Sequence, residues 1–139
     1  SRTQSHLDVA KRLGANDAMK FTENQDEFLS TLKEKHGTLD AAIVFAPADI
    51  VTDTAIKSVK KGGLIVIATV GENPAFSAFE EKTIRGTLIG STKDMEQVIK
   101  ICDEKNIEVI TQTFPLENAN EVLKKLKDSE IEARGVLIP

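Results

Sequence analysis

The chain has 139 residues, of which 40% are hydrophobic and 29% are charged, and its formal net charge is −4. This length is sufficient for one compact domain with a sizeable core, and the negative charge argues against nucleic acid or an anionic membrane surface as the main partner. A single cysteine excludes an internal disulfide framework and a cysteine-cluster metal site. No apolar run reaches membrane-spanning length, so the cytoplasm is the expected compartment.

Segments with helical periodicity alternate with short apolar segments along the chain. In order, the pattern predicts a helix over residues 3–13, a strand over 18–21, a helix over 25–35, a strand over 39–47, a helix over 51–60, a strand over 62–71, a loop over 72–81, a strand over 83–90, a helix from 92 that includes 102, a strand over 107–114, a helix around 119–126 and a strand over 135–138. Thr3 is a plausible N-cap of the first helix, and Asn24 with Glu27 resembles a capping box at the second. This alternation predicts an α/β fold with a parallel sheet and right-handed crossovers.

Residues 62–71 form the most apolar stretch: two glycines, an unbroken apolar run and a closing glycine. A strand that is apolar on both faces needs a layer on each side, so it is predicted to be a central strand. Gly62 and Gly63 are interpreted as the C-cap of the preceding helix. Ligands in open parallel sheets bind at the carboxyl ends of the strands, so Thr69, Val70 and Gly71 are expected near a ligand.

The sequence contains no hydrolase constellation and no phosphate-binding loop motif. His6 and His36 show no metal-ligand spacing, so each is interpreted as a surface histidine. Cys102 lies on the apolar face of its predicted helix, together with Met95, Val98 and Ile99, where a buried, unreactive thiol is expected. The residues by themselves therefore indicate a nucleotide-sized ligand at the edge of an α/β sheet and nothing sharper.

Six segments, which together span the chain, form a recognisable series. They are 7–17 (LDVAKRLGAND), 39–44 (LDAAIV), 61–67 (KGGLIVI), 84–94 (IRGTLIGSTKD), 114–122 (FPLENANEV) and 134–137 (RGVL). In this order they resemble segments of the medium-chain, zinc-type alcohol dehydrogenase family. The resemblance implies a C-terminal fragment of such an enzyme, in which Ser1 stands at the end of the second strand of the dinucleotide-binding (Rossmann) domain.

The resemblance also implies a domain organisation. Residues 1–105 would form a partial, doubly wound Rossmann domain with helices on both faces of a parallel sheet, without its first strand and glycine-rich turn. Residues 106–139 would form a C-terminal strand–helix–strand segment that returns to the catalytic domain of the parent enzyme. Because the missing strands would leave an apolar sheet edge exposed, self-association to a homo-oligomer is expected.

The positions that match cofactor contacts of the family follow from the same resemblance. They are Ser1, Arg2, His6, Phe45, Ala46, Ala68, Thr69, Val70, Thr87, Leu88, Ile89 and Arg134. Ser1 stands where NAD-dependent members carry an aspartate that binds the adenosine ribose, and a serine beside Arg2 would accept the 2′-phosphate of NADP. The resemblance therefore favours NADP over NAD, although Pro47 departs from the glycine usual in the family.

The implied function is hydride transfer between a small alcohol and NAD(P), which yields an aldehyde or ketone. Zinc would polarise the substrate oxygen in the parent enzyme, but this chain carries none of the family's zinc ligands, and the chain alone is expected to be inactive. Two alternatives remain open. The parent could be a zinc-free quinone or enoyl reductase of the same superfamily, or the chain could be a stand-alone nucleotide-binding module without catalysis.

Overall fold

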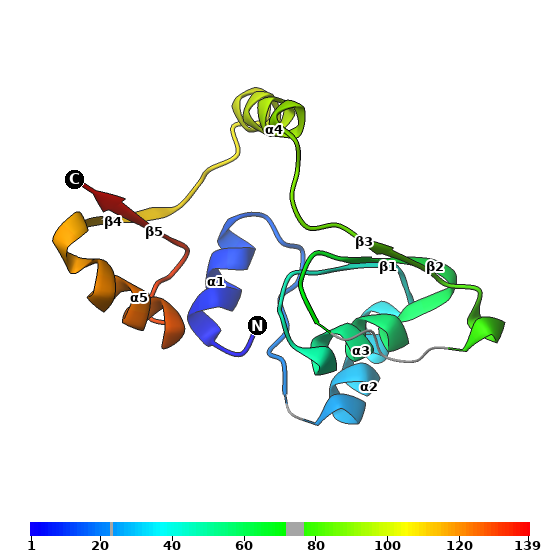
Figure 1. Ribbon diagram of the computed structural model, residues 1–139. Coiled ribbons are helices and arrows are strands. Elements are labelled where there is room, and N and C mark those ends of the chain that lie inside the picture. Colours follow the sequence, from blue (N-terminus) through cyan, green and yellow to red (C-terminus); the bar gives the residue numbers. More distant parts are fainter. Residues whose placement is uncertain (23, 72–76) are drawn as a thin grey trace. The chain divides into compact units, whose positions relative to one another are not determined.

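The computed structural model describes residues 1–22, 24–71 and 77–139 (Figure 1). Contacts within the chain divide it into two compact units. The central unit comprises residues 22–91, and the terminal unit comprises residues 1–21 and 92–139. Each unit contains its own parallel sheet, so the chain has the α/β fold class that the sequence predicts.

The central unit alternates helices and strands. Its elements are α2 (Gln25–His36), β1 (Leu39–Val44), α3 (Asp49–Ser58), β2 (Val59–Ile67), the short 3-10 helix η1 (Ala78–Glu80) and β3 (Thr83–Gly86). The strands are parallel and lie in the order β1-β2-β3, so β2 is the middle strand, as predicted. Helix α2 begins where predicted, because the side chain of its N-cap Asn24 accepts a hydrogen bond from the backbone N–H of Glu27 at 3.2 Å.

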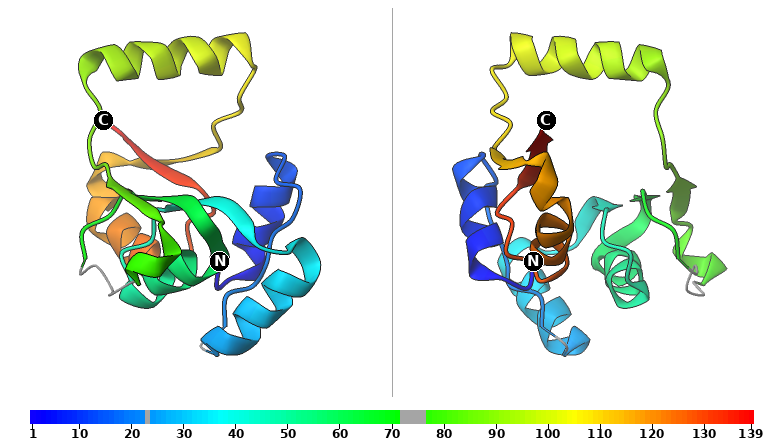
Figure 2. Two further views of the ribbon diagram at one scale, coloured as in Figure 1. Left: turned by 90° about the vertical axis from the view of Figure 1, so that its right-hand side faces the viewer. Right: turned by 60° about the vertical axis from the view of Figure 1, so that its left-hand side comes forward.

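Helix α3 covers one face of this sheet, and Figure 2 shows the packing from two further directions. Ile65 of β2 is fully buried at the centre of the core, which it forms with Val44, Ile56, Val59 and Ile67. The alternate residues of β2, Leu64 and Val66, point to the opposite face and are only half-buried. Of the two predicted layers, the described residues thus provide one, the well-packed core on the face that α3 covers.

Helix α2 packs against α3 through a polar connection. The side-chain amide of Gln25 donates hydrogen bonds to Asp53 Oδ2 and Thr54 Oγ1, each at 2.8 Å. The side chain of Lys57 donates to Gln25 Oε1 at 3.0 Å and forms an ion pair with Asp53 at 2.6 Å. One glutamine therefore joins the first turn of α2 to the middle of α3.

Strand β2 begins with a bulge, and this corrects one prediction. Leu39 lies opposite Val59 and Ala41 opposite Leu64, so residues 60–63 stand opposite a single residue of β1. Gly62 has a φ of +73°, a conformation that glycine adopts without strain. The prediction that Gly62 and Gly63 cap the preceding helix is wrong, because α3 ends at Ser58 and the chain enters the strand directly.

Several boundaries also differ from the predictions. Strand β1 ends at Val44, three residues before the predicted end at Pro47, and β3 spans Thr83–Gly86 instead of 83–90. Both strands stop where the ladder with β2 loses its last paired residues. Of the predicted loop over 72–81, residues 72–76 lie outside the described residues, and residues 78–80 form η1.

The terminal unit is built from the two ends of the chain. Its elements are α1 (Gln4–Arg12), α4 (Thr92–Glu104), β4 (Thr111–Pro115), the short 3-10 helix η2 (Leu116–Asn118), α5 (Ala119–Lys127) and β5 (Arg134–Ile138). Strands β4 and β5 pair in parallel, and Val122 of α5 and Ile131 are buried beside Gly135 of β5. Helix α1 contributes the buried residues Leu7 and Val9. Thr3 occupies its N-cap position, but the threonine side chain makes no capping hydrogen bond.

The predicted strand over 18–21 is not a strand in the structure. The amino group of Ser1 donates to the carbonyl oxygen of Met19 at 3.2 Å, and the N–H of Phe21 donates to the carbonyl oxygen of Ser1 at 2.7 Å. This is the hydrogen-bond pattern of a parallel bridge between Ser1 and Lys20. Two hydrogen bonds to one residue are too few to make a strand, and residues 18–21 are not assigned as one.

Helix α4 has the predicted apolar face, but that face is not buried. The exposed fractions of Met95, Val98 and Ile99 are 60, 53 and 62%, and Cys102 is half-buried. The interpretation of Cys102 as a fully buried core thiol is therefore wrong, because no element among the described residues covers this face. The strand predicted over 107–114 begins only at Thr111.

Candidate functional site

The carboxyl ends of β1, β2 and β3 lie at the same edge of the central sheet, because the three strands are parallel. The ladder continues one step beyond the strands: Ala68 N–H donates to the carbonyl of Val44 and Thr87 N–H to that of Ile67, each at 2.9 Å. Among the described residues, no backbone–backbone hydrogen bond involves residues 69–70 or 88–89. Peptide groups at this edge are therefore available to a ligand.

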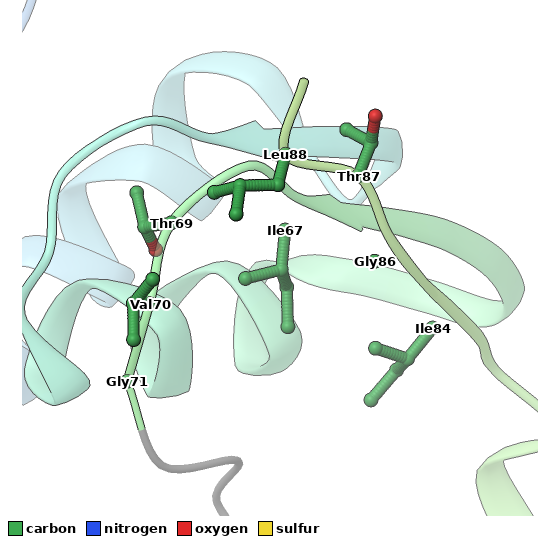
Figure 3. A pocket seen from close by; sticks show the side chains of 8 residues that line it. All are labelled: Ile67, Thr69, Val70, Gly71, Ile84, Gly86, Thr87 and Leu88. Carbon is green, nitrogen blue, oxygen red and sulfur yellow. The ribbon is translucent and has the colours of Figure 1, made fainter. Parts of the chain in front are cut away.

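An open hollow of about 620 Å³ lies between the ends of β2 and β3 (Figure 3). It is lined by Ile67, Thr69, Val70, Gly71, Ile84, Gly86, Thr87 and Leu88. Figure 3 shows the Ile67 side chain in the middle of this group and the Leu88 side chain extending over it. An apolar lining with two hydroxyl groups and free peptide groups suits a flat ring that carries one polar substituent.

Most of the predicted cofactor contacts lie at this edge. They are Phe45 and Ala46 after β1, Ala68, Thr69 and Val70 after β2, and Thr87, Leu88 and Ile89 after β3. Thr69, Val70, Thr87 and Leu88 line the hollow itself. Phe45, Val70 and Ile89 have exposed fractions of 75, 77 and 87%, so large apolar side chains are concentrated on one side of the unit. Such an exposed apolar group indicates a surface that a ligand or partner covers.

The other predicted contacts, Ser1, Arg2, His6 and Arg134, belong to the terminal unit. Ser1 Oγ lies 3.5 Å from Nδ1 of His6, so the structure brings these two residues together. Arg2 and Arg134 are exposed. His6 is half-buried, with Nε2 3.4 Å from the carbonyl oxygen of Ile131, which corrects its interpretation as a surface histidine.

Sequence reasoning missed several residues at the hollow. Ile67, Ile84 and Gly86 form part of its lining. Asp49, the first residue of α3, lies beside it, because a Cβ on Gly71 would be 3.2 Å from Asp49 Oδ1. The signal that could have found Asp49 is topological: the helix that follows a parallel strand begins at the carboxyl edge of the sheet.

The described residues contain no group of three or more His, Cys, Asp or Glu side chains that could hold a metal ion. In the same part of the chain, none of the helices has the length and apolar character needed to cross a membrane.

Comparison with known proteins places the chain in a family. Residues 1–104 match the family model of the zinc-binding dehydrogenases. The chain belongs to this family. An alcohol dehydrogenase from Geobacillus stearothermophilus is 29% identical to it over an alignment of 136 residues that covers 94% of this chain and 40% of that protein. The D-arabinose 1-dehydrogenase (NADP(+)) of Saccharolobus solfataricus is 22% identical over 143 residues, covering 100% of the chain and 41% of that protein.

Solved structures agree on the fold. The crystal structure of the alcohol dehydrogenase from Aeropyrum pernix superimposes with a TM-score of 0.88 at 21% sequence identity, covering 100% of this chain and 41% of that one. The resemblance to zinc-type alcohol dehydrogenases is therefore confirmed at the level of family and fold. This zinc-binding dehydrogenase chain spans about two fifths of the length of the relatives it matches.

Proposed function

We propose that the chain is the cofactor-binding part of an NAD(P)-dependent alcohol dehydrogenase, which transfers a hydride between an alcohol and NAD(P). The observation that carries the proposal is the hollow at the carboxyl ends of β2 and β3, in a chain of the zinc-binding dehydrogenase family. The relatives are more than twice as long as this chain. Residues outside the chain would therefore supply the substrate site, and the chain alone would be inactive.

The residues around the hollow fit the nicotinamide end of a dinucleotide. Ile67 and Leu88 would contact the faces of the ring and exclude water from it. The peptide groups of residues 69–70 and 88–89 would orient the carboxamide, because they have no backbone partner among the described residues. When bound, the dinucleotide supplies the carbon that accepts or donates the hydride.

The adenosine end of the cofactor is proposed to bind Ser1, Arg2 and His6, and its ribose to lie beside Phe45 and Ala46. A guanidinium is a strong partner for phosphate oxygens, which favours the 2′-phosphate of NADP at Arg2 and the pyrophosphate at Arg134. In support, Ser1 and His6 lie together, and the relative from Saccharolobus solfataricus is named for NADP(+).

Zinc does not fit the described residues of this chain, which hold no metal-ligand group. A zinc ion would have to be bound by residues outside the chain, and a zinc-free quinone or enoyl reductase remains the second candidate within the superfamily. The division into residues 1–105 and 106–139, the homo-oligomeric state and the cytoplasmic location also remain proposals.

A direct test compares the full polypeptide that the gene encodes with the 139-residue chain. Alcohol-dependent formation of NADPH or NADH, followed by absorbance, is expected from the former and not from the latter. Leu88→Asp should raise the Kd for the dinucleotide about tenfold or more, because it places a charge in the apolar lining. Leu123→Asp is the control, since Leu123 on α5 is 62% exposed and Leu88 is 64% exposed.

Three results would contradict the proposal. Turnover by the 139 residues alone would show that they contain a complete active site. An unchanged Kd of Leu88→Asp for the dinucleotide would show that the hollow is not part of the cofactor site. Binding of the dinucleotide by the full polypeptide without oxidation of any alcohol, or reduction of any quinone or enoyl compound, would instead favour the stand-alone binding module.

A further inference from the structure

The described residues that line the hollow carry no charged side chain, but the carboxylate of Asp49 lies beside them. Asp49 begins α3, and its Oδ1 would lie 3.2 Å from a Cβ on Gly71, a residue of the hollow lining. Among the described residues, no hydrogen bond or ion pair of the Asp49 side chain is found. Its negative charge is therefore not neutralised by a neighbouring cation of the described structure.

The other charged groups of this region are arranged differently. Asp53, one turn further along α3, is paired with Lys57 at 2.6 Å and bonded to Gln25. Arg85 of β3 lies between Ile84 and Gly86, which both line the hollow, so strand alternation directs Arg85 to the opposite face. Among the described residues, Asp49 is thus a carboxylate placed where its charge can act on the contents of the hollow.

We infer that Asp49 is a specificity-determining residue that favours the oxidised dinucleotide over the reduced one. The inference rests on the function proposed above, with the nicotinamide in the hollow. The oxidised ring is a pyridinium with one positive charge, whereas the reduced dihydropyridine ring is neutral, and the phosphate groups of the two forms are the same. A nearby carboxylate therefore attracts one form of the ring and not the other.

The size of the effect depends on the distance between the carboxylate and the ring, which we take as about 8 Å for a ring in the hollow. At about 8 Å and an effective dielectric constant of about 40 to 80, a carboxylate and a pyridinium change a binding constant by about two- to sixfold. The effect on the phosphates is equal in both forms, so it cancels in the ratio of the two Kd values. This ratio is the quantity to measure.

The experiment uses the full polypeptide and compares Kd for NADP⁺ with Kd for NADPH, by calorimetry without substrate. Asp49→Asn should lower the ratio Kd(NADPH)/Kd(NADP⁺) about two- to sixfold. Asp49→Glu retains the charge and should keep most of the wild-type ratio. Asp40→Asn is the control, because it removes the same charge from the amino end of β1, where Asp40 pairs with Lys60.

The outcomes separate the inference from the proposed function. If both forms bind wild type but Asp49→Asn leaves the ratio unchanged, Asp49 does not act on the ring and the inference is overturned while the proposed function stands. The same holds if Asp40→Asn changes the ratio as much as Asp49→Asn does. If neither NADP(H) nor NAD(H) binds the full polypeptide, the proposed function fails and the inference fails with it.

Discussion

Replacement of Gly63 by alanine tests the bulge that opens strand β2. A Cβ on Gly63 would overlap Cγ1 of Val59 and lie 2.7 Å from the carbonyl oxygen of Asp40 and 3.0 Å from that of Lys60. Val59 belongs to the buried core, and the two oxygens belong to the backbone of β1 and of the bulge itself. None of these neighbours is the flexible end of an exposed side chain, so the backbone or the core has to move.

The expected cost combines two effects of opposite sign. Forcing an extra carbon into a packed site costs about 1–3 kcal/mol, and the reduced freedom of the unfolded chain returns about 0.4–1 kcal/mol. Because two of the three close contacts are with backbone atoms, the cost lies in the upper part of its range. We therefore expect Gly63→Ala to lower the free energy of unfolding by about 1–2 kcal/mol.

Urea unfolding followed by far-UV circular dichroism measures this change. With an m-value of about 2 kcal/mol/M, the midpoint of Gly63→Ala should fall by about 0.5–1 M. Gly86→Ala is the matched control: Gly86 is also a strand glycine, but its Cβ would have no atom within 4 Å. The free energy of unfolding of Gly86→Ala should differ from that of wild type by no more than about 0.5 kcal/mol. Equal midpoints for the two variants would refute the close packing of Gly63 against β1.

Three further predictions concern stability. Lys82→Met should lower the free energy of unfolding in urea by about 1–3 kcal/mol. The reason is that the buried Lys82 ammonium donates a 2.7 Å hydrogen bond to the carbonyl oxygen of Ile56 in the last turn of α3. An unchanged urea midpoint would contradict this role. Asn24→Ala removes the capping hydrogen bond of α2 and should lower the free energy of unfolding by about 0.5–2 kcal/mol. Asn118→Ala, at the start of α5, should leave the free energy of unfolding almost unchanged, because the Asn118 side chain makes no capping hydrogen bond. The hydrogen bond from Lys57 lowers the pKa of Asp53 below its usual value, so the unfolded state binds a proton more readily and the stabilisation is lost as pH falls below about 4 through the lowered pKa. The free energy of unfolding of wild type should therefore exceed that of Asp53→Asn by only about 0.5 kcal/mol at pH 6, because the ion pair is partly exposed. The difference should disappear at pH 2. A difference that persists at pH 2 would contradict the stabilising role of the ion pair.

Local sequence determined the elements and their order. Apolar periodicity depends only on which residues recur along the chain, and it located the helices at 4–12, 25–36 and 119–127 to within a few residues. The unbroken apolar run of residues 64–67 identified the middle strand of the central sheet, because a strand with neighbours on both sides has few polar positions. Parallel topology alone predicted Thr69, Val70 and Gly71 at the carboxyl edge of the sheet, and the family resemblance added Ala68 and residues 87–89.

The tertiary structure decided those features that depend on strand pairing and on distances between residues far apart in the sequence. Gly62 and Gly63 look like a helix cap in sequence, but their role depends on a bulge opposite Asp40, which lies more than twenty residues earlier in the chain. Residues 18–21 have strand composition, yet a strand exists only where a partner supplies a ladder of hydrogen bonds, and here the backbone hydrogen bonds of Met19 and Phe21 go to the single residue Ser1. Asp49 stands out only when the start of α3 is seen beside Gly71, because one carboxylate among many carries no signal in a sequence. Periodicity is a property of neighbours along the chain, whereas register, burial and the charge beside a hollow belong to neighbours in space.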